Sequence, residues 1–176
     1  PAPELIELCD RMGLMVMVET FDEWRAPKMK NGYHLYFDEW AERDLTNTVR
    51  RFRNHPSVVM WCIGNEVPDQ SSYEGAKIAR WLQDICHRED PTRLVTMGID
   101  RVQDAIDTHF AAIMDVVGFN YRTHLYTKAY HELPQQILMG SETASAFSSR
   151  GTYHFPVERT TNKVRPDNQS SGYDLD

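Results

Sequence analysis

Two glutamates that follow short apolar runs are the side chains of this sequence whose types and spacing best suit catalysis. Glu66 comes after the apolar residues 58–63, and Glu142 comes after residues 137–139. Cleavage of a glycosidic bond needs one carboxyl group to protonate the departing oxygen and a second to meet the positive charge that grows on the sugar ring. Either glutamate alone is equally well explained as a solvated loop carboxylate or a helix cap. Together, at equivalent ends of parallel strands, they are predicted to point into one cleft.

The two carboxyl groups would need different protonation states to share that work. One must stay protonated near neutral pH while the other is ionised, and the charge of the ionised group raises the pKa of its neighbour. Small residues precede each glutamate, at 64–65 and at 140–141, and let backbone and substrate approach closely. The pair therefore predicts acid–base chemistry at the ends of two strands.

The elements that must position these glutamates form an alternating pattern of strands and helices. The predicted strands are apolar at every position rather than at every second one, which is typical of parallel strands covered by helices on both faces. Such alternation predicts an α/β fold with a parallel sheet, in which catalytic groups gather at the carboxyl ends of the strands. The strands are expected at residues 14–18, 58–63, 94–97, 116–119 and 137–139, and helical segments at 3–12, 37–52, 78–86 and, briefly, 105–112.

Composition limits the classes of protein that the chain can represent. At 176 residues, 41% of them hydrophobic, it suits one domain or part of one. The net charge of -7, without a basic helix face, argues against nucleic-acid binding. No apolar run approaches the roughly 20 residues of a membrane helix, and the N-terminus does not resemble a signal peptide. The chain is therefore expected to bind neither nucleic acid nor a membrane.

The cysteines and histidines suggest neither a disulfide nor a metal site. Cys9, Cys62 and Cys86 are far apart and each lies within an apolar pattern, so buried free thiols are expected. The seven histidines show no pair at metal-ligand spacing on one helix, so they are interpreted as scattered loop and surface residues. No metal and no cofactor is predicted.

Three tryptophans and one tyrosine are candidates either for packing in the core or for contact with substrate. Trp61 and Trp81 fall on core faces of a strand and a helix and are predicted to pack. Trp24 and Tyr121 lie at or just past strand ends, where an aromatic ring either stacks on a sugar or forms an ordinary wall of the cleft. Between them, residues 25–33 are polar and rich in turn formers, which predicts an exposed loop.

Four ordered segments closely resemble the catalytic barrel of glycoside hydrolase family 2, the family of β-galactosidases, β-glucuronidases and β-mannosidases. The segments are HPSVVMWCIGNE at 55–66, GSE at 140–142, LIELCDRMGL at 5–14 and VVGFNY at 116–121. The resemblance implies that Glu66 is the general acid and base, that Asn65 binds the sugar 2-hydroxyl and that Glu142 is the nucleophile. It also implies that Tyr121 lies near the nucleophile. Further residues look most like β-galactosidase-type members: Thr143, Ala144, Ser145, Arg150, Gly151 and Tyr153.

The chain departs from the family pattern in two respects. Val18 stands where many relatives have an Asp before the glutamate that closes strand three, so the roles of Glu19 and Asp22 in substrate contact stay open. A whole barrel needs about 250 residues, and this chain is expected to hold strands three to seven only. Residues 1–150 are predicted to form that partial (β/α)8 TIM barrel, and residues 151–176 a polar segment that is irregular or leads to strand eight.

The resemblance implies a retaining hydrolase for terminal β-glycosides, with β-galactosides the favoured substrates. A β-glucuronidase or β-mannosidase of the same family is the alternative within enzymes. An inactive fragment that binds carbohydrate, or that has only a structural role, is the alternative from another class. The expected partner is a carbohydrate substrate. The oligomeric state, a homo-oligomer included, and the cellular compartment stay open.

Overall fold

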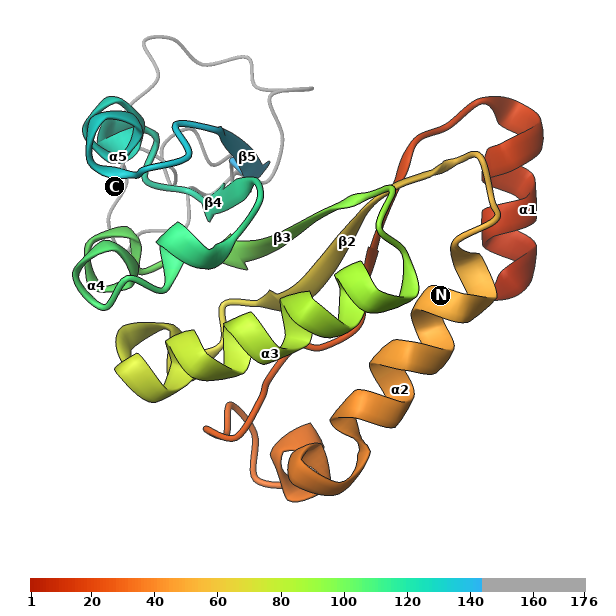
Figure 1. Ribbon diagram of the computed structural model, residues 1–176, viewed down its shortest axis with the longest axis horizontal. Coiled ribbons are helices and arrows are strands. Elements are labelled where there is room, and N and C mark those ends of the chain that lie inside the picture. The colour runs from red at the N-terminus through yellow and green to blue at the C-terminus, as the bar shows by residue number, and fades with distance from the viewer. Residues whose placement is uncertain (144–176) are drawn as a thin grey trace, which may run out of the picture.

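One parallel sheet of five strands organises the part of the chain that the structure describes. The structure is a computed structural model, and it describes residues 1–143 (Figure 1). The strands lie side by side in the order in which they occur in the chain, and every neighbouring pair is parallel. They are β1 (Val16–Glu19), β2 (Val58–Asn65), β3 (Leu94–Ile99), β4 (Val117–Asn120) and β5 (Leu138–Glu142). The predicted α/β class and the five predicted strands are confirmed.

Each of the four connections between strands holds one α-helix and one short 3₁₀ turn, and a further helix precedes β1. The helices are α1 (Pro3–Met12), α2 (Phe37–Phe52), α3 (Tyr73–Glu89), α4 (Val102–Asp107) and α5 (Tyr126–Glu132). The 3₁₀ turns are Tyr33–Leu35, Pro68–Ser71, Ala111–Ile113 and Thr123–Leu125. The predicted helices and the brief crossover are confirmed, whereas α5 was not predicted, because Ala129 is its one buried residue and leaves no apolar period to recognise.

The core lies between the sheet and the helices that follow its strands. Figure 1 shows α2 and α3 next to each other beside the sheet, and the two helices are in contact. The buried side of α2 carries Phe37, Ala41, Leu45, Val49 and Phe52, a helical spacing that places them on one stripe. Each large apolar side chain of this kind contributes roughly 1.5–3 kcal/mol on burial. The three cysteines are buried and free, as predicted.

The first strand begins two residues later than its apolar run suggests. Gly13 ends α1 with a φ of 71°, a left-handed conformation that glycine adopts without steric cost. The chain then turns back, and pairing with β2 starts only where the Val16 N–H donates to the Ser57 carbonyl at 2.8 Å. Leu14 and Met15 are consequently exposed in the turn. The prediction of a strand over 14–18 is therefore wrong at its start.

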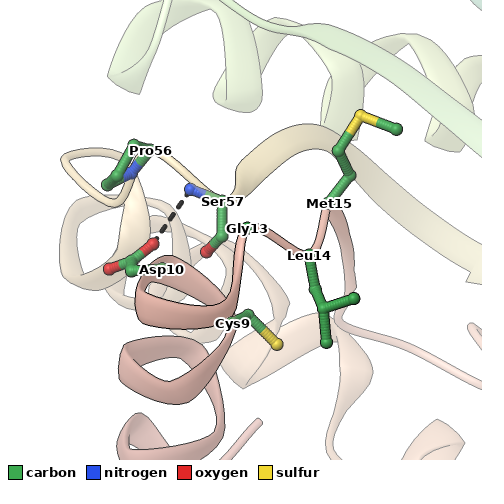
Figure 2. Close-up of a pocket in the computed structure, with 7 residues that line it drawn as sticks. All are labelled: Cys9, Asp10, Gly13, Leu14, Met15, Pro56 and Ser57. Carbon is green, nitrogen blue, oxygen red and sulfur yellow. Dashed lines mark hydrogen bonds between the residues drawn. The ribbon is translucent and has the colours of Figure 1, made fainter.

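A pocket of about 170 Å³ lies at the amino ends of β1 and β2 (Figure 2). Its lining residues are Cys9, Asp10, Gly13, Leu14, Met15, Pro56 and Ser57. The Asp10 carboxylate accepts the Ser57 backbone N–H at 2.9 Å and lies 2.6 Å from His55 Nδ1. These two hydrogen bonds lower the pKa of Asp10 to about 2. The amino end of such a sheet serves stability rather than chemistry, and Asp10 accordingly ties α1 to the start of β2.

None of the helices within residues 1–143 combines the length and the apolar character needed to cross a membrane. The predicted boundary at residue 150 and the predicted polar segment 151–176 lie outside the described residues.

Candidate active site

The carboxyl ends of four strands bring polar side chains to one edge of the sheet. Glu19 is the last residue of β1, Asn65 of β2, Asn120 of β4 and Glu142 of β5. Glu66 follows β2 directly. Because the strands are parallel, these ends meet on the same side, opposite to the pocket of Figure 2. The structure thus brings both predicted catalytic glutamates to the same edge.

Asn120 joins the two glutamates. Its side chain is buried, and its Nδ2 lies 2.9 Å from Asn65 Oδ1, 2.9 Å from Glu66 Oε1 and 3.3 Å from Glu142 Oε2. The amide has two hydrogens, so these three acceptors share them. Ser141 Oγ donates to Asn120 Oδ1 at 2.7 Å, which fixes the amide with its nitrogen toward the carboxylates.

Asn120 was not among the site residues predicted from the sequence. The available signal was its place as a polar residue that closes an apolar strand, the same signal that marked the two glutamates. Through its contacts the distance between one carboxyl oxygen of each glutamate has an upper limit. Glu66 Oε1 and Glu142 Oε2 lie no further apart than the 2.9 Å and 3.3 Å contacts to their common nitrogen placed end to end.

Tyr121 contacts Glu142 with both its hydroxyl group and its backbone. The hydroxyl donates to Glu142 Oε1 at 2.7 Å, and the backbone N–H donates to the Glu142 carbonyl at 2.6 Å. The bond to Glu142, burial and the negative charges of Glu66 and Glu142 raise the pKa of Tyr121 above its usual range. The hydroxyl therefore stays protonated and remains a donor to Glu142. This is the position near Glu142 that the family resemblance implied for Tyr121.

Backbone strain accompanies this group of side chains. Glu66 and Tyr121 have φ angles of 46° and 56°, in the left-handed region that residues with a side chain rarely adopt. Such conformations cost about 1–3 kcal/mol each and persist where the surrounding structure holds them. Both strained residues follow directly on a strand end that carries an asparagine.

Glu19 adds a third carboxylate to the same edge. Loss of water around its carboxyl group raises the pKa of Glu19, and the negative charges of Asp22 and Glu142 add to this effect. Cys62 Sγ lies 3.2 Å from Glu19 Oε2 as a thiol donor, and burial keeps that thiol protonated by raising its pKa. Asp22 is exposed and pairs with Lys28 Nζ at 2.9 Å. Their roles in substrate contact remain predictions.

Trp24 is placed differently from the prediction that it could stack on a sugar. Its side chain is fully buried, its Nε1 donates to the Ile63 carbonyl at 2.9 Å, and its ring packs against Phe37 and Phe110. A ring without an exposed face cannot contact substrate, so that part of the prediction is wrong. Trp61 is buried as predicted.

Glu23 is a buried carboxylate that the sequence analysis passed over. It accepts the backbone N–H groups of Lys28, Met29 and His34 at 2.7, 3.3 and 2.9 Å, and lies 2.9 Å from His34 Nδ1. Burial opposes its ionisation, but these hydrogen bonds outweigh burial and lower the pKa of Glu23 to about 2. The predicted loop at 25–33 is largely exposed, yet it is wrapped around this carboxylate.

The described residues offer no group suited to a metal ion. Within residues 1–143, no three His, Cys, Asp or Glu side chains are grouped as metal ligands would be. The carboxylates at the edge instead receive hydrogen bonds from amide, hydroxyl and thiol groups.

Consecutive βα units with carboxylates at the carboxyl ends of a parallel sheet define part of a TIM barrel, with the candidate site at the end where such barrels carry their chemistry. The chain belongs to glycosyl hydrolase family 2. The sequence profile of that family's TIM barrel domain matches residues 1–156.

Named relatives and solved structures agree with this assignment. The chain is 36% identical to the β-galactosidase BoGH2A of Bacteroides ovatus over 90% of its own length, and 29% identical to a putative β-glucuronidase of Formosa agariphila over 98%. A crystal structure of a family 2 member from Bacteroides cellulosilyticus matches 83% of the chain with a TM-score of 0.78 and 39% identity. The chain spans 22% and 15% of the two named relatives and 19% of that solved chain.

Proposed function

We propose that the polypeptide carrying this chain is a retaining glycoside hydrolase that removes terminal β-linked sugars, with Glu142 as nucleophile and Glu66 as acid and base. The observation that supports this proposal best is the contact of one Asn120 nitrogen with both glutamates. Retaining enzymes hold their two carboxyl groups about 5–5.5 Å apart, whereas inverting enzymes need about 6.5–9.5 Å to admit a water. The limit that the shared nitrogen sets on one oxygen of each group is compatible with the shorter separation.

In the proposed first step, a Glu142 oxygen forms a bond to the anomeric carbon while the bond from that carbon to the leaving oxygen breaks. Glu66 gives its proton to the leaving oxygen. In the second step, Glu66 takes a proton from a water, whose oxygen bonds to the anomeric carbon and releases Glu142. The two steps return both carboxyl groups to their starting states.

Neighbouring donors orient the proposed nucleophile. The Tyr121 hydroxyl bonds Glu142 Oε1 and the Asn120 amide contacts Oε2, so each carboxylate oxygen has a donor. Asn65, held by the same Asn120 amide, lies beside Glu66 where the resemblance places the ligand of the sugar 2-hydroxyl. Hydrogen bonds to that hydroxyl group strengthen in the transition state of this reaction class.

A β-galactoside is the proposed substrate. The relative named as a β-galactosidase is 36% identical over 90% of the chain, whereas relatives named as β-glucuronidases are 29% identical over 98% or 36% identical over only 54% of it. A β-glucuronide is the second candidate, since a solved β-glucuronidase from Bacteroides uniformis also matches the fold with a TM-score of 0.54. Turnover of nitrophenyl β-galactoside, β-glucuronide and β-mannoside by the complete polypeptide would decide between them. Binding of sugar without turnover of any of these would favour a non-catalytic role.

Labelling tests the nucleophile directly. A 2-fluoro glycoside of the preferred sugar with an activated leaving group should inactivate the complete polypeptide and leave a covalent adduct on Glu142. The fluorine slows both steps, but the leaving group keeps formation of the glycosyl-enzyme faster than its hydrolysis, so the intermediate accumulates. Peptide mass spectrometry would locate the adduct. A label on Glu19 or Asp22 instead would contradict the assignment of Glu142.

A further inference from the structure

The segment that follows β1 crosses the end of β2 and bonds its backbone on both sides of Asn65. Trp24 Nε1 donates to the Ile63 carbonyl at 2.9 Å, and the Asn65 N–H donates to the Phe21 carbonyl at 3.1 Å. Lys28 Nζ then donates to the Asn65 carbonyl at 2.7 Å. The end of β2 is thus held by three residues from one neighbouring loop.

The peptide unit that joins Asn65 to Glu66 is bonded at both of its polar atoms. Its carbonyl oxygen accepts from Lys28, and its N–H, on Glu66, donates to the Gly98 carbonyl at 2.8 Å. Rotation of this peptide plane would change the φ of Glu66, which is held at the strained value of 46°. A charge-assisted hydrogen bond contributes about as much free energy as such a conformation costs.

Lys28 is itself fixed from two directions. Its backbone N–H donates to the buried Glu23 at 2.7 Å, and its ammonium group pairs with Asp22 at 2.9 Å. The side chain is only 22% exposed. The loop approaches Glu23 so closely that a Cβ on Gly32 would overlap its carboxylate. Lys28 therefore extends from an anchored loop, which makes it suited to hold another backbone segment in place.

We propose that Lys28 is a positioning residue for Glu66, holding the peptide between Asn65 and Glu66 in the orientation that aims the Glu66 carboxyl group at Asn120. This inference rests on the proposed function, because the orientation of Glu66 limits turnover only if Glu66 is the acid and base. Lys28 contacts a backbone carbonyl rather than the Glu66 side chain, so it acts through the peptide and not in the chemistry.

The kinetic test compares three variants of the complete polypeptide. Lys28→Met keeps the length of the side chain and removes its donor, Lys28→Arg keeps a charged donor, and Lys30→Met changes an exposed lysine of the same loop as the control. Misplacing a catalytic group by about 1 Å can cost about 10²-fold in rate. We expect Lys28→Met to lose about that much kcat/KM on aryl glycosides with poor leaving groups, which need the proton of Glu66, and far less on those with good leaving groups.

Two further measurements distinguish a positioning role of Lys28 from a general loss of structure: rescue of activity by Lys28→Arg, and amide hydrogen exchange near Glu66. Lys28→Arg should recover a large part of the loss, and Lys30→Met should match the parent protein on both substrate types. Hydrogen exchange of a peptide covering residues 63–67 should become at least about tenfold faster in Lys28→Met and stay unchanged in Lys30→Met, as the loss of one charge-assisted hydrogen bond predicts.

Two results would overturn the inference. An equal loss of kcat/KM on good and poor leaving groups would give Lys28 a merely structural role. Unchanged exchange at residues 63–67 in Lys28→Met would show that Lys28 does not hold the peptide, and this measurement needs no turnover. Absence of turnover by the parent polypeptide would instead contradict the proposed function, and the exchange result would still decide whether Lys28 fixes the end of β2.

Discussion

Asn120 donates from one amide group toward acceptors that come from two other strand ends. Its nitrogen contacts Asn65, Glu66 and Glu142, and its oxygen is held by Ser141. A donor placed in this way orients both carboxyl groups and limits how far they can move apart. Loss of this amide is therefore expected to disturb both proposed catalytic groups at once.

Asn120→Ala removes this shared donor. We expect kcat/KM for the preferred aryl glycoside to fall about 10²–10³-fold, the range observed when one preorganised donor is deleted from an active site. Ser141→Ala is the matched comparison, because it leaves the donor in place and removes only the bond that fixes the amide orientation. Its loss should be smaller. Equal losses in the two variants would show that the Asn120 donor contributes no more than the bond that orients it, which contradicts the role given to the donor.

Glu66→Ala removes the proposed acid and base while leaving the nucleophile. Substrates with poor leaving groups need a proton in the first step, so their kcat/KM should fall about 10²–10⁴-fold and that of activated substrates much less. Added azide should restore turnover of activated substrates and give a β-glycosyl azide, because it attacks the glycosyl intermediate without base assistance. Uniform loss on all substrates, with no azide product, would argue against the role of Glu66.

The strands and the residues at their ends could be predicted because both signals are local. A continuous apolar run identifies a buried strand, and the polar residue that ends it identifies the edge, so Glu66 and Glu142 were singled out as candidates without knowledge of any contact. The family resemblance added Asn65 and the place of Tyr121 near the nucleophile, and the roles of all four residues stay predictions. Asn120 gives the same local signal, but its importance comes from contacts with residues up to 55 positions away. Trp24 shows the reverse case, since a bond to Ile63, 39 positions distant, buries a ring that its sequence position suggested was exposed.

The structure of the loops was harder to predict than the strands, because it depends more on contacts between residues that are distant in the sequence. The polar composition of residues 25–33 predicted an exposed loop and gave no sign that Glu23 bonds three backbone N–H groups within it. A carboxylate next to aromatic residues is normally interpreted as exposed, and only the folded loop reveals that it is buried. The hydrogen bonds that order the connection after β1 could therefore not be predicted from the sequence.

Glu23→Gln tests how this loop is stabilised. The pKa of Glu23 falls from 4.5 to about 2 on folding. The unfolded chain therefore binds the proton more readily, and the stabilisation is present above about pH 4.5 and is lost as the pH falls toward 2. At pH 7 the substitution should lower the free energy of unfolding by roughly 1.5–3 kcal/mol, the range for hydrogen bonds to a charged group.

Denaturant unfolding at pH 7 and near pH 3 would measure this difference. The deficit of Glu23→Gln relative to the parent protein should shrink at the lower pH, because the parent then loses part of the same stabilisation. Glu39→Gln, at an exposed site on α2, serves as the control and should show little deficit at either pH. A deficit for Glu23→Gln that is independent of pH would show that its charge does not stabilise the loop.

At the scale of the whole molecule, the described sheet is an open part of a barrel. Among residues 1–143, β1 pairs with β2 alone and β5 with β4 alone, so each has one free edge. Closed barrels have no such edges. The apolar side chains of Leu5, Leu8 and Met12 on α1 are exposed as well. The walls of a sugar pocket come from loops all around a barrel, and five strands supply only part of them.

We therefore expect the 176 residues expressed alone to turn over the preferred glycoside at least about 10²-fold more slowly than the complete polypeptide, because incomplete walls leave substrate poorly oriented against Glu66 and Glu142. The free edges and the exposed face of α1 should also make the isolated segment associate, which size-exclusion chromatography over a range of concentrations would detect. Glu142→Gln in the complete polypeptide gives the background rate of a folded but inactive site. Turnover by a monomeric 176-residue segment well above that background, and close to the parent rate, would show that these residues build a working pocket by themselves.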